Sequence, residues 1–189
     1  MTLRKVVEWL VTLAASAAGV LVFEVEVAQP FRVPTSSMEP TLECARNVAD
    51  VGCTGSFNDR VLVAKVVYRF RDPERGEIAV FNAPAAAARL CGEGGVYLKR
   101  VIGLPGDVVS EQNGTVYIDG KPLSEPYVAP QDRDTLTKSW PRLGPGEYFM
   151  LGDNRSGSCD SRTWGPVPRS AFIGPVVATY WPPNRWGVP

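Results

Sequence analysis

The chain has 189 residues, of which 20 are basic and 20 acidic, and 44% of its residues are hydrophobic. The balanced charge provides no basic surplus for binding nucleic acid, and the absence of histidine excludes a Ser-His-Asp triad and any histidine-ligated metal site. This length fits one folded domain with an anchor better than two domains.

The first predicted element is a helix over residues 6–27. Residues 9–23 carry no charge, and as a helix they span about 22 Å, less than a hydrocarbon core of about 30 Å. Flanking valines extend the apolar character past Glu8, Glu24 and Glu26, so we expect one membrane-spanning helix with acidic edges. A cleaved secretory signal, a buried core helix and an interfacial helix are the alternatives.

The basic residues around this segment predict its orientation. Arg4 and Lys5 precede it, and no basic residue follows until Arg32. The positive-inside rule therefore places residues 1–5 in the cytoplasm and residues 28–189 outside it.

The rest of the chain is predicted to be mostly β. Short runs rich in valine, isoleucine, tyrosine and phenylalanine, bounded by turn-forming residues, are typical of strands. We expect a bent antiparallel sheet, as a sandwich or a partly open barrel, behind the single helix. Residues 83–94 and 126–145 are predicted to be loops. The predicted strand runs are 59–70, 76–81, 95–104, 107–123, 146–153 and 173–181.

Two dipeptides within the fourth run predict tight turns. Asn113-Gly114 and Asp119-Gly120 are strong hairpin signals, and the apolar stretch "TVYI" lies between them. We therefore expect a small hairpin and loop insertion around residues 108–145.

The four cysteines, Cys44, Cys53, Cys91 and Cys159, show no CxxC spacing, so a cysteine-ligated zinc site is not expected. They could be small buried residues, or they could form two disulfides, which would require an oxidising compartment. A Cys44–Cys53 bond closes a short loop without reorganising the fold and would contribute about 2.7 kcal/mol in the chain-entropy model. The sequence leaves the pairing of Cys91 with Cys159 open.

The segment "VPTSSMEPTL" (33–42) holds two adjacent serines, Ser36 and Ser37. If one is a nucleophile, its base must be a lysine, a carboxylate, a tyrosine or a thiolate, because histidine is absent. A lysine base needs apolar surroundings, since its reference pKa of about 10.4 keeps it protonated at neutral pH. Lys65 and Lys99 both lie in predicted strands with apolar neighbours. The pattern does not choose between them, and a Lys99 amine exposed to solvent is the alternative.

Four segments resemble, in the same order, the conserved boxes of bacterial type I signal peptidases, peptidase family S26. The resemblance covers most of residues 28–185 and implies a Ser–Lys serine endopeptidase with a fold like that of self-cleaving repressors. It also implies a single-pass protein of the bacterial cytoplasmic membrane that removes signal peptides from exported preproteins. The four segments are "VPTSSMEPTL" (33–42), "RGEIAVF" (75–81), "YLKRVIGLPGD" (97–107) and "GDNRSGSCDSRTWG" (152–165).

The resemblance assigns catalytic roles residue by residue. Ser37 matches the nucleophile and Lys99 the general base. Thr35 stands where the family usually has serine and would stabilise the oxyanion together with the Ser37 backbone N–H. Ser158 matches the serine that orients the lysine. Ser36 replaces the family's usual glycine.

The resemblance also implies how substrate binds. An extended substrate would pair with residues 30–34 and 95–99 and present small side chains at the first and third positions before the cleaved bond. No metal, cofactor or nucleic acid is expected; the expected partners are signal peptides and the lipid bilayer, and the protein is expected to be a monomer. The expected pocket walls are Phe31, Val33, Met38, Leu42, Tyr97 and Leu98, and the expected structural charges are Asp153, Arg155, Asp160 and Arg162.

Two other functions compete with this interpretation. A cytosolic Ser–Lys self-cleaving repressor would need a DNA-binding domain before the serine, where this sequence has a short, largely apolar segment. A membrane-anchored β module without activity would not need both Ser37 and Lys99. The sequence therefore favours the peptidase.

Overall fold

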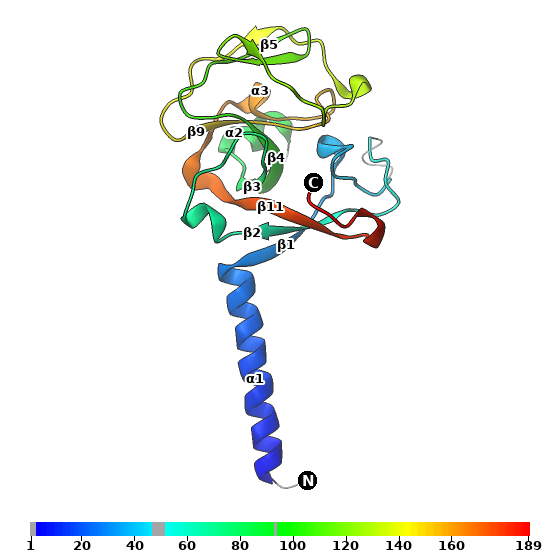
Figure 1. Cartoon of the computed structure of the whole chain (residues 1–189), viewed down its shortest axis with the longest axis vertical. Coiled ribbons are helices and arrows are strands. Elements are labelled where there is room, and N and C mark those ends of the chain that lie inside the picture. Colours follow the sequence, from blue (N-terminus) through cyan, green and yellow to red (C-terminus); the bar gives the residue numbers. More distant parts are fainter. Residues whose placement is uncertain (1–2, 47–51, 93) are drawn as a thin grey trace.

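The computed structural model describes residues 3–46, 52–92 and 94–189, and the side chains of residue 3 and residues 21–25 lie outside the description. A long helix, α1 (Leu3–Glu26), projects from a β-rich body formed by the rest of the chain (Figure 1). The predicted helix at the N-terminus is thus present as a helix.

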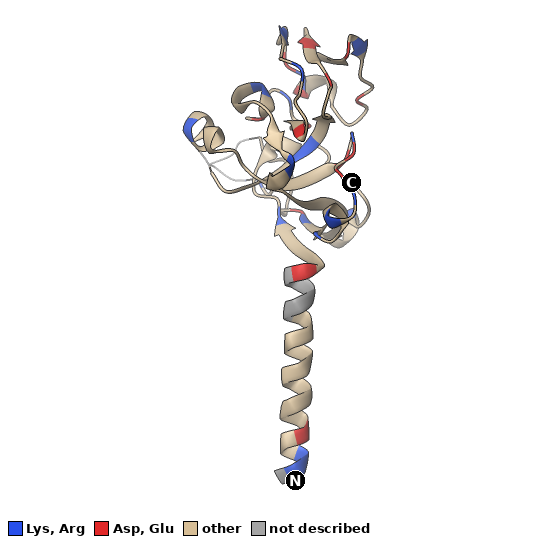
Figure 2. Cartoon of the chain, turned by 90° about the vertical axis from the view of Figure 1, so that its left-hand side faces the viewer, with Lys and Arg blue, Asp and Glu red and all other residues tan. Residues whose placement is uncertain are grey.

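The charges on α1 lie near its ends. Arg4, Lys5 and Glu8 occupy its first turns, and the described middle of the helix carries no charge (Figure 2). Among the described residues, no helix is both apolar and long enough to cross a bilayer. This finding does not support the predicted membrane span at residues 6–27.

The main sheet is antiparallel throughout its paired strands. Strand β11 (Phe172–Trp181) pairs with β3 through its first half and with β2 through its second half, and its register shifts mark bulges that bend the sheet. The expectation of a mostly antiparallel β fold is confirmed. Over the described residues the order is β1 (Ala28–Arg32), β2 (Arg60–Ala64), β11, β3 (Ile78–Asn82), β4 (Val96–Gly103), β9 (Glu147–Leu151) and β10 (Val167–Pro168).

A smaller sheet covers one end of the body (Figure 1). Its turns use positive φ angles of 48° at Asn113 and 75° at Gly114, and of 48° at Asp119 and 78° at Gly120. Such angles are the ones that Asn-Gly and Asp-Gly hairpin turns adopt. In the described chain its strand order is β7 (Lys121–Pro122), β6 (Thr115–Ile118), β5 (Val109–Gln112) and β8 (Lys138–Ser139).

Two sequence expectations for local structure are wrong. The predicted loop at 83–94 contains α2 (Ala85–Cys91), because its run of alanines has high helix propensity and Pro84 precedes the first turn. The predicted strand at 59–70 ends at Ala64 and continues into a turn. The remaining short helices are α3 (Ser161–Trp164) and the 3₁₀ turns η1 (Ser36–Met38), η2 (Val67–Arg69), η3 (Pro130–Asp132), η4 (Arg169–Ala171) and η5 (Pro183–Arg185).

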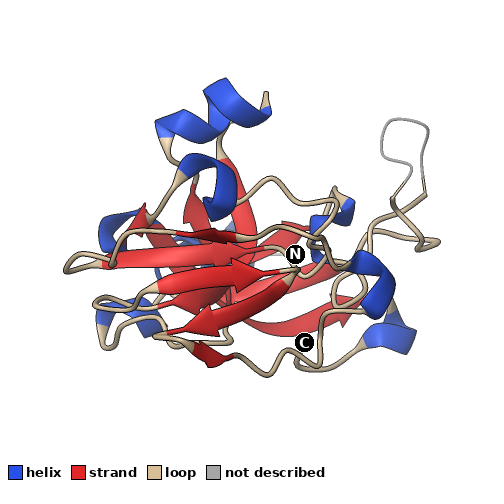
Figure 3. Ribbon diagram, turned by 90° about the horizontal axis from the view of Figure 1, so that it is seen from above, coloured by secondary structure: helices blue, strands red, loops and turns tan. Residues whose placement is uncertain are grey.

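The core places the serine-containing segment against the main sheet. Met38 and Leu42 are fully buried and pack with Val61, Val63 and Val80 from β2 and β3. Viewed from above, the strands form the centre of the body and the short helices lie around it (Figure 3). Burial of these apolar side chains fixes η1 on the sheet.

Candidate active site

Ser37 lies in the 3₁₀ turn η1, directly after an extended segment. The Val33 N–H donates to the Asp59 carbonyl at 2.9 Å, and the Glu39 N–H closes the turn on the Ser36 carbonyl at 3.0 Å. Met38 anchors the turn in the core, and Ser37 is 9% exposed. The local sequence therefore holds the Ser37 hydroxyl in a fixed, mostly buried position.

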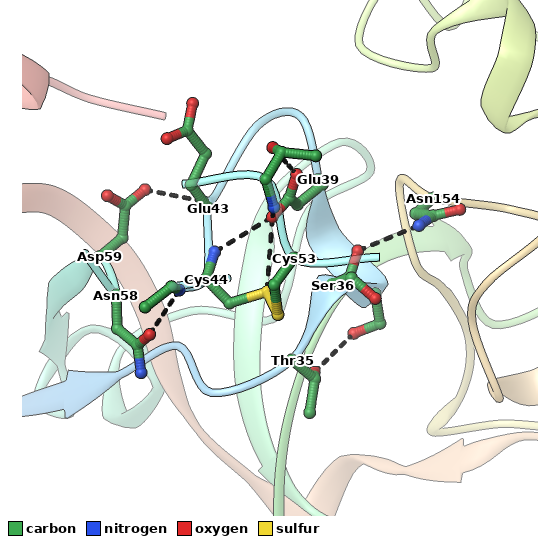
Figure 4. The surroundings of a disulfide bond; sticks show 12 residues. Thr35, Ser36, Glu39, Glu43, Cys44, Cys53, Asn58, Asp59 and Asn154 are labelled. Carbon is green, nitrogen blue, oxygen red and sulfur yellow. Dashed lines mark hydrogen bonds between the residues drawn. A yellow bond between two sulfur atoms is a disulfide. The ribbon is translucent and has the colours of Figure 1, made fainter. Parts of the chain in front are cut away.

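The segment after β9 supports this turn from the other side. The Asn154 N–H donates to the Ser37 carbonyl at 3.2 Å, and Asn154 Nδ2 donates to the Ser36 carbonyl at 3.2 Å (Figure 4). Any Cβ at Gly152 would overlap the Ser37 carbonyl oxygen and Ser158 Oγ. Sequence reasoning did not single out Asn154 or Gly152, although both lie in a motif that it used.

Lys99 reaches Ser37 from strand β4. Its side chain is 5% exposed, and Nζ donates a hydrogen bond to Ser37 Oγ, 62 residues away in the sequence. Nζ also lies 5.8 Å from the centroid of the Tyr97 ring. The alternative of a solvent-exposed Lys99 amine is therefore wrong. Lys65, the competing lysine, is only half-buried and lies in the turn after β2.

Arg100 points to the opposite face of β4. Its guanidinium donates to both carboxylate oxygens of Asp153, at 2.8 and 2.6 Å, and lies 3.9 Å from the centroid of the Tyr127 ring. Thr41 Oγ1 donates to the same Asp153 carboxylate at 2.6 Å. Adjacent residues of β4 thus have separate roles, since Lys99 meets Ser37 and Arg100 ties the strand to the segment after β9.

The other charged residues of the last motif also form buried ion pairs. Arg155 pairs with Glu125, and its Nε donates to the Gly152 carbonyl at 2.9 Å. Arg162 pairs with Asp160 at 2.8 Å. Sequence reasoning did not single out Glu125, because its partner Arg155 lies 30 residues away. These pairs fix the loop internally and tie it to Glu125.

Two hydroxyl groups expected at the site are near it. Thr35 Oγ1 lies 3.3 Å from Ser37 Oγ, within hydrogen-bonding distance. Ser158 Oγ is buried, and it has no hydrogen-bond partner in the described part of the chain. The hydrogen bond expected from Ser158 to Lys99 is therefore not formed in this structure, although Ser158 lies beside the turn.

A cavity of about 460 Å³ opens beside Ser37, Lys99 and Thr35. Of the six apolar residues predicted to wall the substrate pockets, the cavity is lined by Val33, Met38, Tyr97 and Leu98. Phe31 and Leu42 do not line it. Leu42 is 0% exposed because it packs behind Met38 in the core, and Phe31 packs at the margin of the same apolar cluster.

Both cysteine pairs form disulfides, Cys44–Cys53 and Cys91–Cys159. Glu39 holds the first one close to the serine turn, because its Oε1 accepts hydrogen bonds from the Cys44 N–H at 3.2 Å and the Thr54 N–H at 2.9 Å (Figure 4). The potential ligand atoms of Glu39, Cys44 and Cys53 lie within 4.8 Å of one another. Because a disulfide offers no thiolate, this group lacks the ligands that a zinc site needs.

Comparison with known proteins shows which family this chain is similar to. A family model described as "Signal peptidase, peptidase S26" matches residues 6–181. The chain is 40% identical over 179 residues to a probable signal peptidase I-2 of Synechocystis sp., covering 95% of this chain and 73% of that relative. It is 39% identical over 184 residues to a signal peptidase I of Leptolyngbya laminosa, covering 95% of this chain and 82% of that relative. A crystal structure of a signal peptidase I from Enterococcus faecalis V583 is 31% identical, with a TM-score of 0.47, and the match covers 56% of this chain and 97% of that one.

Proposed function

Because the chain belongs to the signal peptidase family, peptidase S26, we propose that it is a serine endopeptidase that removes signal peptides from exported preproteins. In this proposal Ser37 is the nucleophile and Lys99 the general base. The observation that carries the proposal is the buried Lys99 amine, which is hydrogen-bonded to Ser37 Oγ in the wall of the cavity.

The first step is the removal of a proton from Ser37. Burial disfavours the charged form of a lysine, so the surroundings of Lys99 support a neutral amine that can accept a proton. The neighbouring Arg100 points away and is neutralised by Asp153. As Ser37 Oγ attacks the substrate carbonyl carbon, its proton moves to Lys99 Nζ.

The second step is collapse of the tetrahedral intermediate. The Thr35 hydroxyl and the Ser37 N–H are proposed to stabilise the oxyanion, and one such donor is typically worth about 3 kcal/mol. Lys99 returns its proton to the leaving amine, which breaks the peptide bond and leaves an acyl ester on Ser37. Lys99 then takes a proton from a water molecule that attacks the ester, and it returns this proton to Ser37 Oγ as the signal peptide leaves.

The cavity supports a preference for small substrate side chains. Its apolar walls include Val33, Met38 and Leu98. The two segments predicted to flank an extended substrate, residues 30–34 and 95–99, both contribute residues to the cavity lining. A substrate strand between them would receive main-chain hydrogen bonds and present its small side chains to the cavity.

The two disulfides support a location outside the cytoplasm for residues 28–189, because such bonds persist in oxidising compartments. Association with the bacterial cytoplasmic membrane, contact with lipid and the monomeric state remain predictions from the sequence and the family resemblance.

The test uses purified protein and a synthetic peptide that spans a signal-peptide cleavage site. Wild type should cleave the peptide, and Ser37→Ala and Lys99→Ala should reduce cleavage to background. Ser36→Ala, in the same turn, is the matched control and should keep most of the activity, with thermal melts reporting folding. An active Ser37→Ala protein would show that another residue is the nucleophile.

A further inference from the structure

The disulfide between Cys91 and Cys159 lies in the wall of the cavity beside Ser37. Both cysteines line the cavity, although they are 68 residues apart in the sequence. Cys91 is the last residue of α2, and Cys159 follows the loop that supports the serine turn. The disulfide therefore joins a peripheral helix to the catalytic segment at the place where substrate is proposed to bind.

The Cys159 end of this link is held firmly. Asp160, the next residue, is fully buried and caps α3 by accepting a hydrogen bond from the Arg162 N–H at 3.2 Å. The same carboxylate accepts a hydrogen bond from the Gly152 N–H at 3.1 Å. Cys159 thus occupies a position set by the loop that also holds the Ser37 carbonyl.

The Cys91 end belongs to a seven-residue helix that contacts the core mainly through alanines. Ala87 is the buried residue of α2, and an alanine side chain offers little apolar surface for packing. Arg89 and Leu90 are exposed. Gly92 ends the helix with a φ of 78°, and Gly95 follows with a φ of 99° just before β4. Glycine restricts its backbone less than other residues do, so these two positions add little restraint at the end of the helix.

We propose that the Cys91–Cys159 disulfide is a specificity-determining element that fixes α2 at the cavity wall and so limits the size of the substrate side chain that the cavity accepts. This inference rests on the proposed peptidase function. Ser37 and Lys99 are carried by η1 and β4, not by α2. Loss of the link should therefore act on the choice of substrate through the width of the cavity.

The experiment compares kcat/KM for three peptides that carry alanine, valine or leucine at one position next to the cleaved bond, tested position by position. Wild type should prefer alanine. In the double variant Cys91→Ala and Cys159→Ala, the alanine-to-leucine ratio should fall by about tenfold or more at one position at least, since a pocket typically discriminates one methylene by about 10- to 200-fold. The matched control, Cys44→Ala with Cys53→Ala, should keep the wild-type ratio.

A second measurement does not depend on the folding of the double variant. The Cys44→Ala, Cys53→Ala protein keeps Cys91–Cys159 as its disulfide, and a phosphine reductant added to the folded protein should lower the same ratio. The inference is overturned if the alanine-to-leucine ratio is unchanged at every position both in the Cys91→Ala, Cys159→Ala variant and after reduction. It is also overturned if the ratio falls equally in the Cys44→Ala, Cys53→Ala protein before reduction. Failure of wild type to cleave any of the peptides is a different result, because it overturns the proposed function itself.

Discussion

Glu111 predicts a specific dependence of stability on pH. It lies in β5, is 1% exposed, and neither carboxylate oxygen has a hydrogen-bond partner among the described residues. Burial is the main cause that raises the pKa of this carboxyl to about 7; Asp134 and Asp160 add to the effect, and Arg162 and Arg155 oppose it. At pH 5 the folded protein should therefore hold Glu111 in its neutral form.

The size of the effect follows from proton linkage. The unfolded chain ionises Glu111 near pH 4.5, and the folded chain ionises it near pH 7. Because the folded-state pKa is raised, the stabilising contribution is fully present below pH 4.5 and is lost as the pH rises through about 7. Between pH 5 and pH 8 this amounts to about 2 to 3 kcal/mol of the free energy of unfolding.

The assay is urea unfolding of wild type and Glu111→Gln at pH 5 and at pH 8. The variant is neutral at both values, so wild type should lose about 2 to 3 kcal/mol more than the variant between them. Glu74→Gln, which removes an exposed carboxylate, is the control and should follow wild type. Parallel pH dependence in wild type and Glu111→Gln would mean that the folded protein ionises Glu111 normally.

Two further predictions concern catalysis. Thr35→Val should lower kcat by about 100-fold or more with a smaller change in KM, because an oxyanion donor acts on the transition state, and Thr35→Ser should restore turnover; equal kcat for Thr35→Val and wild type would remove the hydroxyl from the mechanism. Lys99→Arg should be inactive, since a guanidinium does not deprotonate in a protein, and a pH profile of wild-type kcat/KM should rise with a midpoint below the ordinary lysine value of about 10.4. Near-normal turnover by Lys99→Arg would move the base to another residue.

The sequence predicted those parts of the fold that depend on local chemistry. Asn113-Gly114 and Asp119-Gly120 adopt the expected turns because short polar side chains and glycine tolerate positive φ. The run at 95–104 forms β4 with nearly the expected bounds. The helix α2 was missed although its alanines favour a helix, because a seven-residue helix is marginal without the packing that the folded protein supplies.

The candidate site likewise depends on tertiary contacts that the sequence pattern could not predict. Motifs indicated Ser37 and Lys99, but the residue pattern alone could not separate Lys99 from Lys65, because burial depends on how the strands pack. The ion pair between Arg100 and Asp153 joins residues 53 positions apart, so strand register and not sequence spacing decides it. Leu42 was assigned to a pocket wall by the family resemblance, and tertiary packing places it in the core instead.

Because side chains alternate between the two faces of β4, the face on which Lys99 lies depends on the number of residues that precede it in the strand. Lys99 lies opposite Ala79 and Arg100 opposite Ile78 in the pairing with β3. A slip of one residue, such as a single deletion before Leu98 would cause, exchanges the two faces. It would present a permanently charged guanidinium to Ser37 and place Val101 where Arg100 now pairs with Asp153. Insertions and deletions in this strand should therefore abolish activity, because a step of one exchanges the faces and a step of two moves Lys99 by about 7 Å along the strand.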